Sequence, residues 1–187
     1  MTSTERETLL KHLGESRERL LRMARGLSCE QWHYRAAPGR WTVAECVEHI
    51  ATVEGRILGA IQRSLQAEPD DSKLSGWKGK EQEMLADVAG RVTRFPAPEV
   101  VLPTGRWPEE RLLEEFEGAR ERTREFAAST EADLRRHFFK HPVFGELDLY
   151  QWMMLLAAHC DRHREQSEEV MGSPGFPGGG REEKASA

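Results

Sequence analysis

The chain has 187 residues, a length that suits one domain with a hydrophobic core of its own. It carries 27 basic and 32 acidic side chains, a net charge of −5, and no block rich in lysine and arginine, so we expect no nucleic-acid partner. Its three cysteines form no CxxC pair, and no apolar stretch approaches the roughly 20 residues of a membrane span. We therefore expect a cytoplasmic protein without disulfides and without membrane contact.

The first predicted helix covers residues 4–27, where apolar side chains recur with helical rather than alternating spacing. We expect Ser3 or Thr4 as its N-cap, and Gly26 weakens its end. Residues 28–41 follow and are rich in turn-forming residues, which predicts a connection rather than a long element.

A second long helix is predicted from Thr42 to about residue 66. Thr42 and Glu45 form the capping-box pattern, in which each side chain accepts a hydrogen bond from the backbone N–H of the other residue. His49 lies beside the apolar stripe of this helix. The sequence therefore places one polar ring close to a face that should be buried.

Residues 67–108 form a long connection with mixed signals. A short helix is expected over residues 81–92, whereas prolines predict extended chain at residues 95–98 and 102–105. A connection of this length is unusual in a compact domain and is often functional or poorly ordered. We expect a crossover, or a lid over one end of the domain.

The third long helix should open at Pro108, because proline suits a first helical turn, and should end near residue 129. Thr130 is then the expected cap of a short helix over residues 131–135. Residues 137–145 are predicted to be a loop.

The fourth long helix is predicted over residues 149–171 and completes a domain of residues 1–171. Residues 172–187 are a low-complexity tail that we expect to be disordered. Four long helices with little strand signal predict an all-α, antiparallel four-helix bundle, with the long connection between its second and third helices.

The strongest chemical signal is the pair His159 and His163. Residues four apart lie on the same face of a helix, so two imidazoles can bind one ion from one side. The residues between them lack the glutamate of the zinc proteases, which excludes that class. The pair alone is a weak signal, but both rings share the apolar face of their helix, and His49 lies beside the stripe of another. A buried ring without a partner is costly, and metal ligation would explain three of them.

Three neutral imidazoles suit Zn²⁺, Ni²⁺, Fe²⁺ or Cu²⁺ rather than Ca²⁺ or Mg²⁺. Three protein ligands leave coordination positions for water or substrate, as in a reactive site. Glu45, Asp161 and Glu165 are candidates to orient a ligand or to take a proton, although a solvated surface charge is the commoner role. Cys46 and Cys160 are candidate thiolate ligands, although a small buried hydrophobe is the commoner role.

The remaining histidines, His12, His33, His137 and His141, have no partner at helical spacing, and we expect each of them in a loop or on the surface. A core that holds no metal at all is the simplest alternative for the three inward-facing histidines. Only the distances between these side chains in the folded protein can decide between a metal site and a metal-free core.

Three stretches of this chain together resemble the DinB/YfiT-like superfamily. Residues 39–50 (GRWTVAECVEHI) are similar to its helix start, W-[ST]-x-x-[EQ]-x-x-x-H-[IL]. Residues 141–145 (HPVFG), followed by Trp152, are similar to its approach to the last helix. Residues 159–166 are similar to its closing HxxxHxxQ. The joint pattern is far more specific than any one of its parts.

This resemblance implies an up-down-down-up bundle that holds one divalent ion, usually zinc or nickel. Carried over residue by residue, the ligands would be His49, His159 and His163. Some members of the family are thiol S-transferases or mycothiol-dependent isomerases, and many have no known activity. For this chain the resemblance implies a metal-dependent thiol S-transferase or hydrolase. Its partners would be a low-molecular-weight thiol and an electrophilic small molecule. The alternative is a non-catalytic, metal-binding stress-response bundle, and a homodimer is one possible assembly.

Overall fold

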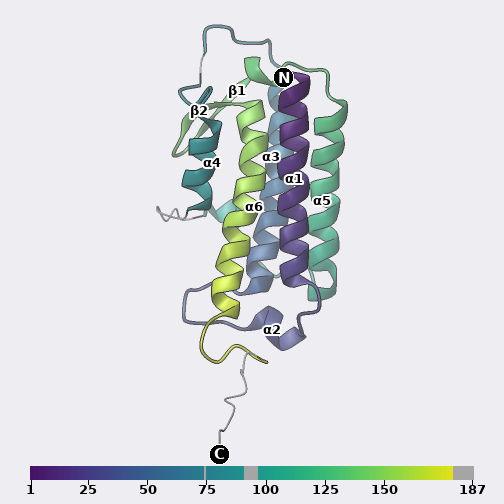
Figure 1. The fold of residues 1–187 in the computed structure, drawn as a ribbon, viewed down its shortest axis with the longest axis vertical. Helices are drawn as coiled ribbons and strands as arrows, with labels where there is room; N and C mark the ends of the chain where they lie inside the picture. Colours follow the sequence, from purple (N-terminus) through teal and green to yellow (C-terminus); the bar gives the residue numbers. More distant parts are fainter. Residues whose placement is uncertain (74, 91–96, 179–187) are drawn as a thin grey trace, which may run out of the picture.

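Four long helices form the body of the protein, and the computed structural model describes residues 1–73, 75–90 and 97–178. The helices are α1 (Ser3–Ala24), α3 (Val43–Ser64), α5 (Glu109–Ser129) and α6 (Leu149–Met171), which run side by side in Figure 1. α1 packs against α5 and α6, and α3 packs against the same two helices. α1 and α3 therefore lie across a diagonal of the bundle. The predicted four-helix bundle is confirmed.

Contacts between helix ends give the direction of each long helix. Arg135 binds carboxylates at the start of both α1 and α6, so these two helices begin at the same end. Arg6, in the first turn of α1, donates a hydrogen bond to a backbone carbonyl at the end of α5. His49, near the start of α3, lies against His163, near the end of α6. α3 and α5 therefore run opposite to α1 and α6.

The first long helix starts earlier and ends earlier than the sequence predicts. Its N-cap is Thr2, whose hydroxyl accepts a hydrogen bond from the backbone N–H of Glu5 at 3.2 Å, so the caps expected at the next two residues were wrong. The Glu5 carboxylate accepts from the backbone N–H of Thr2 in return, at 2.7 Å. The helix ends at Ala24, because Gly26 takes a φ of 82° that suits glycine.

The capping box of α3 is confirmed: the Thr42 hydroxyl accepts from the Glu45 N–H at 3.2 Å, and the Glu45 carboxylate accepts from the Thr42 N–H at 2.8 Å. The turn-rich segment before it contains a five-residue helix, α2 (Cys29–His33), that the sequence analysis missed. Ser28 caps α2, and Trp32 anchors it in the core with 6% of its surface exposed.

The long connection is partly helical. α4 (Glu81–Ala89) confirms the expected short helix and packs against α6, with Met84 and Leu85 buried. It ends before residue 92, and the predictions for residues 91–96 lie outside the described residues. One further turn, η1 (Glu99–Val101), precedes an extended stretch as far as α5. Figure 1 shows α4 standing beside α6 as an additional layer.

The loop predicted over residues 137–145 is instead part of a β-hairpin. β1 (Phe138–His141) pairs antiparallel with β2 (Gly145–Asp148). Each strand has four residues, so only two side chains per face carry the alternating pattern, which is too few to identify a strand from sequence. Gly145 has a φ of 72°, a conformation that glycine adopts at the end of a tight turn.

Two cap predictions at α5 and after it need correction. Pro108 is the N-cap of α5 rather than its first helical residue, while the end at residue 129 is as predicted. The short helix expected over residues 131–135 is a single turn, η2 (Leu134–Arg136). Asp133, rather than Thr130, caps this turn, since its carboxylate accepts the N–H of Arg135 at 3.2 Å.

The chain beyond α6 returns to α2. The Tyr34 hydroxyl donates to the carbonyl of Pro174 at 2.7 Å, and the Gln31 side chain donates to the carbonyl of Pro177 at 2.9 Å. Phe176 packs edge-on against Tyr34, with ring centroids 5.5 Å apart. These contacts involve residues 172–178, and the disorder predicted for residues 179–187 lies outside the described residues.

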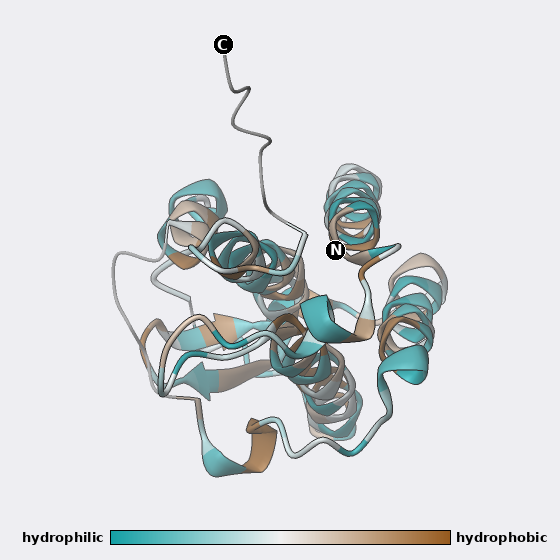
Figure 2. Ribbon diagram, turned by 90° about the horizontal axis from the view of Figure 1, so that it is seen from below, coloured by the Kyte–Doolittle hydropathy of each residue, from teal (hydrophilic) through white to brown (hydrophobic). Residues whose placement is uncertain are grey.

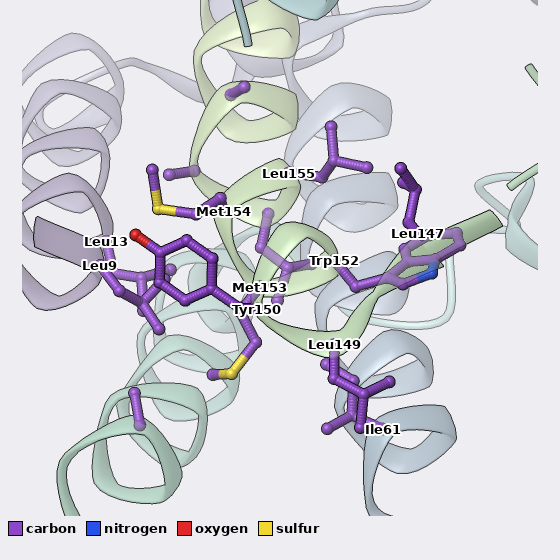
Figure 3. Close-up of a cluster of buried hydrophobic side chains, with 14 of the residues drawn as sticks. Leu9, Leu13, Ile61, Leu147, Leu149, Tyr150, Trp152, Met153, Met154 and Leu155 are labelled. Carbon is purple, nitrogen blue, oxygen red and sulfur yellow. The ribbon is translucent and has the colours of Figure 1, made fainter. Parts of the chain in front are cut away.

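The core lies between the long helices and under the hairpin. Figure 2, which looks along the bundle, shows hydrophobic ribbon on helix faces that are turned toward one another. In Figure 3, Leu9 and Leu13 of α1 lie close to Tyr150 and Met154 of α6. Trp152 joins the hairpin to α6, because its indole N–H donates to the Phe139 carbonyl at 3.0 Å. No helix in the described part of the chain combines the length and hydropathy needed to cross a membrane.

Candidate metal centre

The structure brings His49, His159 and His163 together between α3 and α6. One ring nitrogen of each lies within 4.8 Å of the corresponding atoms of the other two. The ring centroids of His159 and His163 are 4.5 Å apart. The ring centroid of His49 lies 5.0 Å from that of His159 and 4.6 Å from that of His163. The i, i+4 spacing on α6 and the antiparallel approach of α3 together produce this cluster.

Two of the three rings are oriented by hydrogen bonds on their outer nitrogen. Nδ1 of His49 lies 2.8 Å from the carbonyl oxygen of Val101, and Nδ1 of His163 lies 3.0 Å from Oε1 of Gln166. A carbonyl oxygen only accepts, so each Nδ1 carries the proton and each Nε2 bears the lone pair. Outer partners of this kind fix the tautomer and raise the basicity of a metal-binding histidine.

Burial favours the neutral form, the one that binds metal, for two of the three rings. It lowers the pKa of His49, although the Val101 carbonyl opposes the shift. It also lowers the pKa of His159 well below the usual value, and the other two rings add to that effect. His49 and His163 are 3% and 8% exposed, whereas His159 is only partly buried. The accessible side of the cluster therefore lies at His159.

The donor set fits a divalent transition metal. Nε2 of His49 is 3.2 Å from Nε2 of His159, and the former atom offers a lone pair. Either a proton on His159 or a cation must lie between these two nitrogens. Tetrahedral zinc with bonds of about 2.0–2.1 Å separates two nitrogen ligands by about 3.3 Å, close to the observed distance. Three neutral imidazoles suit zinc or nickel rather than calcium or magnesium.

Trp41 covers one side of the cluster. Its ring centroid lies 4.8 Å from that of His49 and 5.6 Å from that of His163, and it stacks on the latter at 24°. It immediately precedes Thr42, so the start of α3 positions the indole as well as His49. An apolar wall of this kind limits the access of water to a metal. From sequence, Trp41 is recognisable only as part of the motif at residues 39–50, and its contact with the histidines depends on the fold.

The long connection contributes directly to the site. Glu48, 2% exposed, accepts hydrogen bonds from the backbone N–H groups of Thr104 at 2.7 Å and Gly105 at 2.8 Å. Its carboxylate also lies 3.3 Å from Nε of Arg106. Together with the contact of His49 to Val101, these bonds fasten residues 101–106 onto α3. These contacts could not be predicted from sequence, because the partners are more than 50 residues apart.

The acids expected near the site are engaged elsewhere. Each pairs with an arginine: Glu45 with Arg35 at 2.7 Å, Asp161 with Arg19 at 2.7 Å, and Glu165 with Arg164 at 3.0 Å. Glu45 also belongs to the capping box of α3. The alternative interpretation of these residues, as structural and surface charges, fits the geometry better than a role in proton transfer.

The buried cysteines do not join the cluster. Burial raises the pKa of the Cys160 thiol to about 12, and its Sγ lies 3.7 Å from the carbonyl of Ser16, on the side of α1. Cys46 is also fully buried, and neither residue belongs to the histidine group among the described residues. The role of small buried side chain, weighed as the commoner one, fits both positions.

The remaining histidines meet the expectation of surface or loop positions only in part: His33 is exposed as expected, whereas His12 lies within α1. His137 is buried, with 8% of its surface exposed. His141 ends β1, and its Nδ1 accepts hydrogen bonds from the backbone N–H groups of Val143 and Phe144 at 3.1 and 3.2 Å. His33 has Cys29 one turn before it, a helical spacing that the sequence analysis overlooked.

The sequence profile of the DinB superfamily matches residues 12–167, a segment that includes all three clustered histidines. The chain belongs to the DinB superfamily. This confirms the resemblance inferred from the three sequence stretches, which span the same segment.

Two proteins of Bacillus subtilis are similar to this DinB superfamily chain, one in sequence and one in fold. YuaE of strain 168, described as uncharacterized, is 26% identical over 148 residues, which are 78% of this chain and 86% of YuaE. The solved structure of YfiT matches with a TM-score of 0.60 at 16% identity and covers 91% of this chain and 88% of YfiT. YfiT is described as a probable metal-dependent hydrolase with an unusual four-helix bundle topology. At this identity the match shows a shared fold.

Proposed function

We propose that this protein is a metal-dependent hydrolase that acts through one divalent transition metal ion, zinc or nickel, on His49, His159 and His163. The observation that carries the proposal is the convergence of the three rings, two of which are oriented by the protein through their outer nitrogen. The description of YfiT, which shares this fold, as a probable metal-dependent hydrolase supports it.

The residues around the cluster have separable roles in this proposal. The Val101 carbonyl and the Gln166 side chain hold two ligands in one tautomer, and Trp41 excludes water from one face. Three protein ligands leave a coordination position for substrate or water, on the side where His159 is partly exposed. When bound, the ion supplies Lewis acidity, which polarises a substrate oxygen and acidifies a water ligand.

A thiol S-transferase is the second candidate, and one observation favours it. Glu45, Asp161 and Glu165, the acids considered for proton transfer, are each paired with an arginine, which leaves them poorly placed as general bases. A thiol bound to a metal needs no such base, because coordination deprotonates it outright. The partners would then be a low-molecular-weight thiol and an electrophilic small molecule.

Turnover assays on protein loaded with zinc or nickel, compared with chelated protein, test both candidates. The panel holds esters, amides and phosphoesters alone, and chlorinated electrophiles with low-molecular-weight thiols. We expect metal-dependent hydrolysis that His163→Ala abolishes and that His12→Ala, a change on α1 outside the cluster, leaves intact. Turnover only with a thiol present would replace the hydrolase by the transferase. Bound metal without turnover in either arm would instead support a non-catalytic metal-binding bundle.

A further inference from the structure

A second group of metal-binding side chains lies at the end of the bundle where α5 begins. We propose that Cys29, His33 and Glu109 form a zinc site, distinct from the histidine centre, that ties α2 to α5. One ligand atom of each residue lies within 4.8 Å of the others. This group shares no residue with the histidine cluster. Figure 1 shows α2 lying beneath this end of the bundle.

α2 presents two of the three ligands in a fixed arrangement. Cys29 and His33 are four residues apart on one helical turn, the spacing at which two side chains can bind one ion. The helix has a complete capping box between Ser28 and Gln31. Its buried Trp32 packs in the core, so five residues that would not form a stable helix alone are held in place.

Glu109 faces this pair from the first turn of α5. Its Oε2 lies 3.1 Å from Nε2 of His33, yet this oxygen is enclosed and accepts no hydrogen bond. Two ligand atoms on one tetrahedral zinc ion are separated by about 3.3 Å, given zinc bonds to nitrogen and oxygen of about 2.0–2.2 Å. The distance therefore suits two ligands of one ion, and a cation would satisfy the enclosed oxygen.

The surroundings favour a cation. The thiol proton of Cys29 faces the carboxylate of Glu109, and the negative charges of Glu110 and Glu30 lie nearby. A bound metal would displace this proton to solvent and bind the thiolate, which neutralises part of the acidic group. Sulfur, imidazole and carboxylate ligands are the set that zinc accepts, with water in the remaining position.

Cobalt(II) titration of the full chain under anaerobic conditions tests the proposal, because the two sites give different spectra. A thiolate ligand produces a sulfur-to-cobalt charge-transfer band in the near ultraviolet, whereas three imidazoles give only the weaker visible bands. We expect two equivalents of Co²⁺ to bind. Cys29→Ser should remove the charge-transfer band and keep the other site, and His163→Ala should do the reverse.

Matched variants test the carboxylate ligand. Glu109→Gln should weaken Co²⁺ binding at this site by about tenfold or more, since the loss of even an outer partner costs about 10–100-fold. Glu30→Gln removes the same charge from a nearby side chain that is not a ligand and should weaken the affinity far less than Glu109→Gln does. Absence of the band in the unmodified protein, or its survival in Cys29→Ser, would overturn the proposal. An equal effect of both glutamine variants would reduce Glu109 to a surface charge and overturn its role as a ligand.

Discussion

Two polar clusters are buried between the long helices, and they are completed in opposite ways. Arg120 and Glu54 are 0% and 1% exposed and form a paired contact, with Nη2 of the arginine 2.8 Å from Oε2 of the glutamate. Arg120 also donates to the Leu13 carbonyl at 2.7 Å and the Ser16 hydroxyl at 2.6 Å on α1, and reaches the Leu156 carbonyl on α6. The guanidinium of Arg120, which lies on α5, thus forms hydrogen bonds with α1, α3 and α6.

The histidine cluster lies on only two of these four helices, α3 and α6, and its rings point their inner nitrogens at one another. The protein bonds the outer nitrogens of His49 and His163, so the polar groups that converge are acceptors. A buried charge without a partner is expensive, which is why the arginine has its carboxylate. The contrast separates a cluster whose charges the protein itself neutralises from one whose converging acceptors fit the proposed cation.

The largest effect on stability should come from breaking the buried pair of Arg120 and Glu54. Arg120→Met leaves Glu54 buried and uncompensated, and we expect a loss of about 3–5 kcal/mol in the free energy of unfolding, measured by urea denaturation. Adding Glu54→Leu should recover most of this loss. Arg122→Ala, a surface change on the same helix, should alter the stability by less than about 0.5 kcal/mol. A small effect of Arg120→Met would show that the pair is not a stability determinant.

A somewhat smaller effect on stability should come from adding zinc to the histidine cluster. At free zinc one hundredfold above its dissociation constant, the free energy of unfolding should rise by about 2.7 kcal/mol. We expect His163→Ala to lose this increment and Arg120→Met to keep it, because the two clusters share no residue. Thermal melting with zinc and with a chelator measures both. An equal increment in His163→Ala would remove this residue from the site.

Much of the fold could be predicted from sequence because local signals agreed with it. The capping box at Thr42 places the start of α3, and helical periodicity placed the four long helices to within a few residues. The elements that were missed are short: α2 has five residues, and each strand of the hairpin has four. Such elements depend on tertiary contacts, as the burial of Trp32 shows, and local propensity does not report those.

The residues of the candidate site also divide into those that a local sequence pattern predicts and those that only the fold brings together. The i, i+4 pair on α6 is a local pattern and was predicted from spacing, whereas His49 was singled out through the family resemblance. The carbonyl of Val101 could not be predicted, because every residue has one and only the folded chain selects it. The pair of Cys29 and His33 had a visible spacing and was overlooked, since its third ligand is 76 residues further along the chain (109 − 33).

A moderate effect is expected from the outer partner of His163. Gln166→Leu removes the oxygen that holds its Nδ1–H and should weaken zinc binding by about 10–100-fold, with little loss of stability in chelated protein. Gln166→Glu offers a stronger acceptor and should restore the affinity. Glu165→Gln, one residue earlier, should bind zinc as the unmodified protein does. Competition titration with a chromophoric chelator measures all three, and equal affinities for Leu and Gln at position 166 would contradict an orienting role.

The smallest effect is expected at His141, a histidine whose ring nitrogen is hydrogen-bonded by the backbone of its own hairpin. Burial lowers the pKa of His141 to about 4, and its unprotonated Nδ1 accepts two backbone hydrogen bonds in the hairpin. The unfolded chain, with a pKa near 6.5, therefore binds the proton first as the pH falls, so the stability that is present above pH 6.5 declines toward pH 4. Allowing for the partial exposure of the ring, we expect a contribution of about 1 kcal/mol between pH 7 and pH 5.

His141→Asn isolates this contribution, since asparagine can accept a hydrogen bond from the backbone of the same turn but does not titrate. Urea denaturation in chelator, at pH 7 and pH 5, should show a smaller decline for the variant than for the unmodified protein. Any titration of His49 and His159 occurs in both proteins, so the difference between the two declines belongs to His141 alone. Equal declines would mean that this ring is already solvated in the folded protein. Unequal declines that persist with saturating zinc would place the titrating group in the hairpin and outside the metal centre.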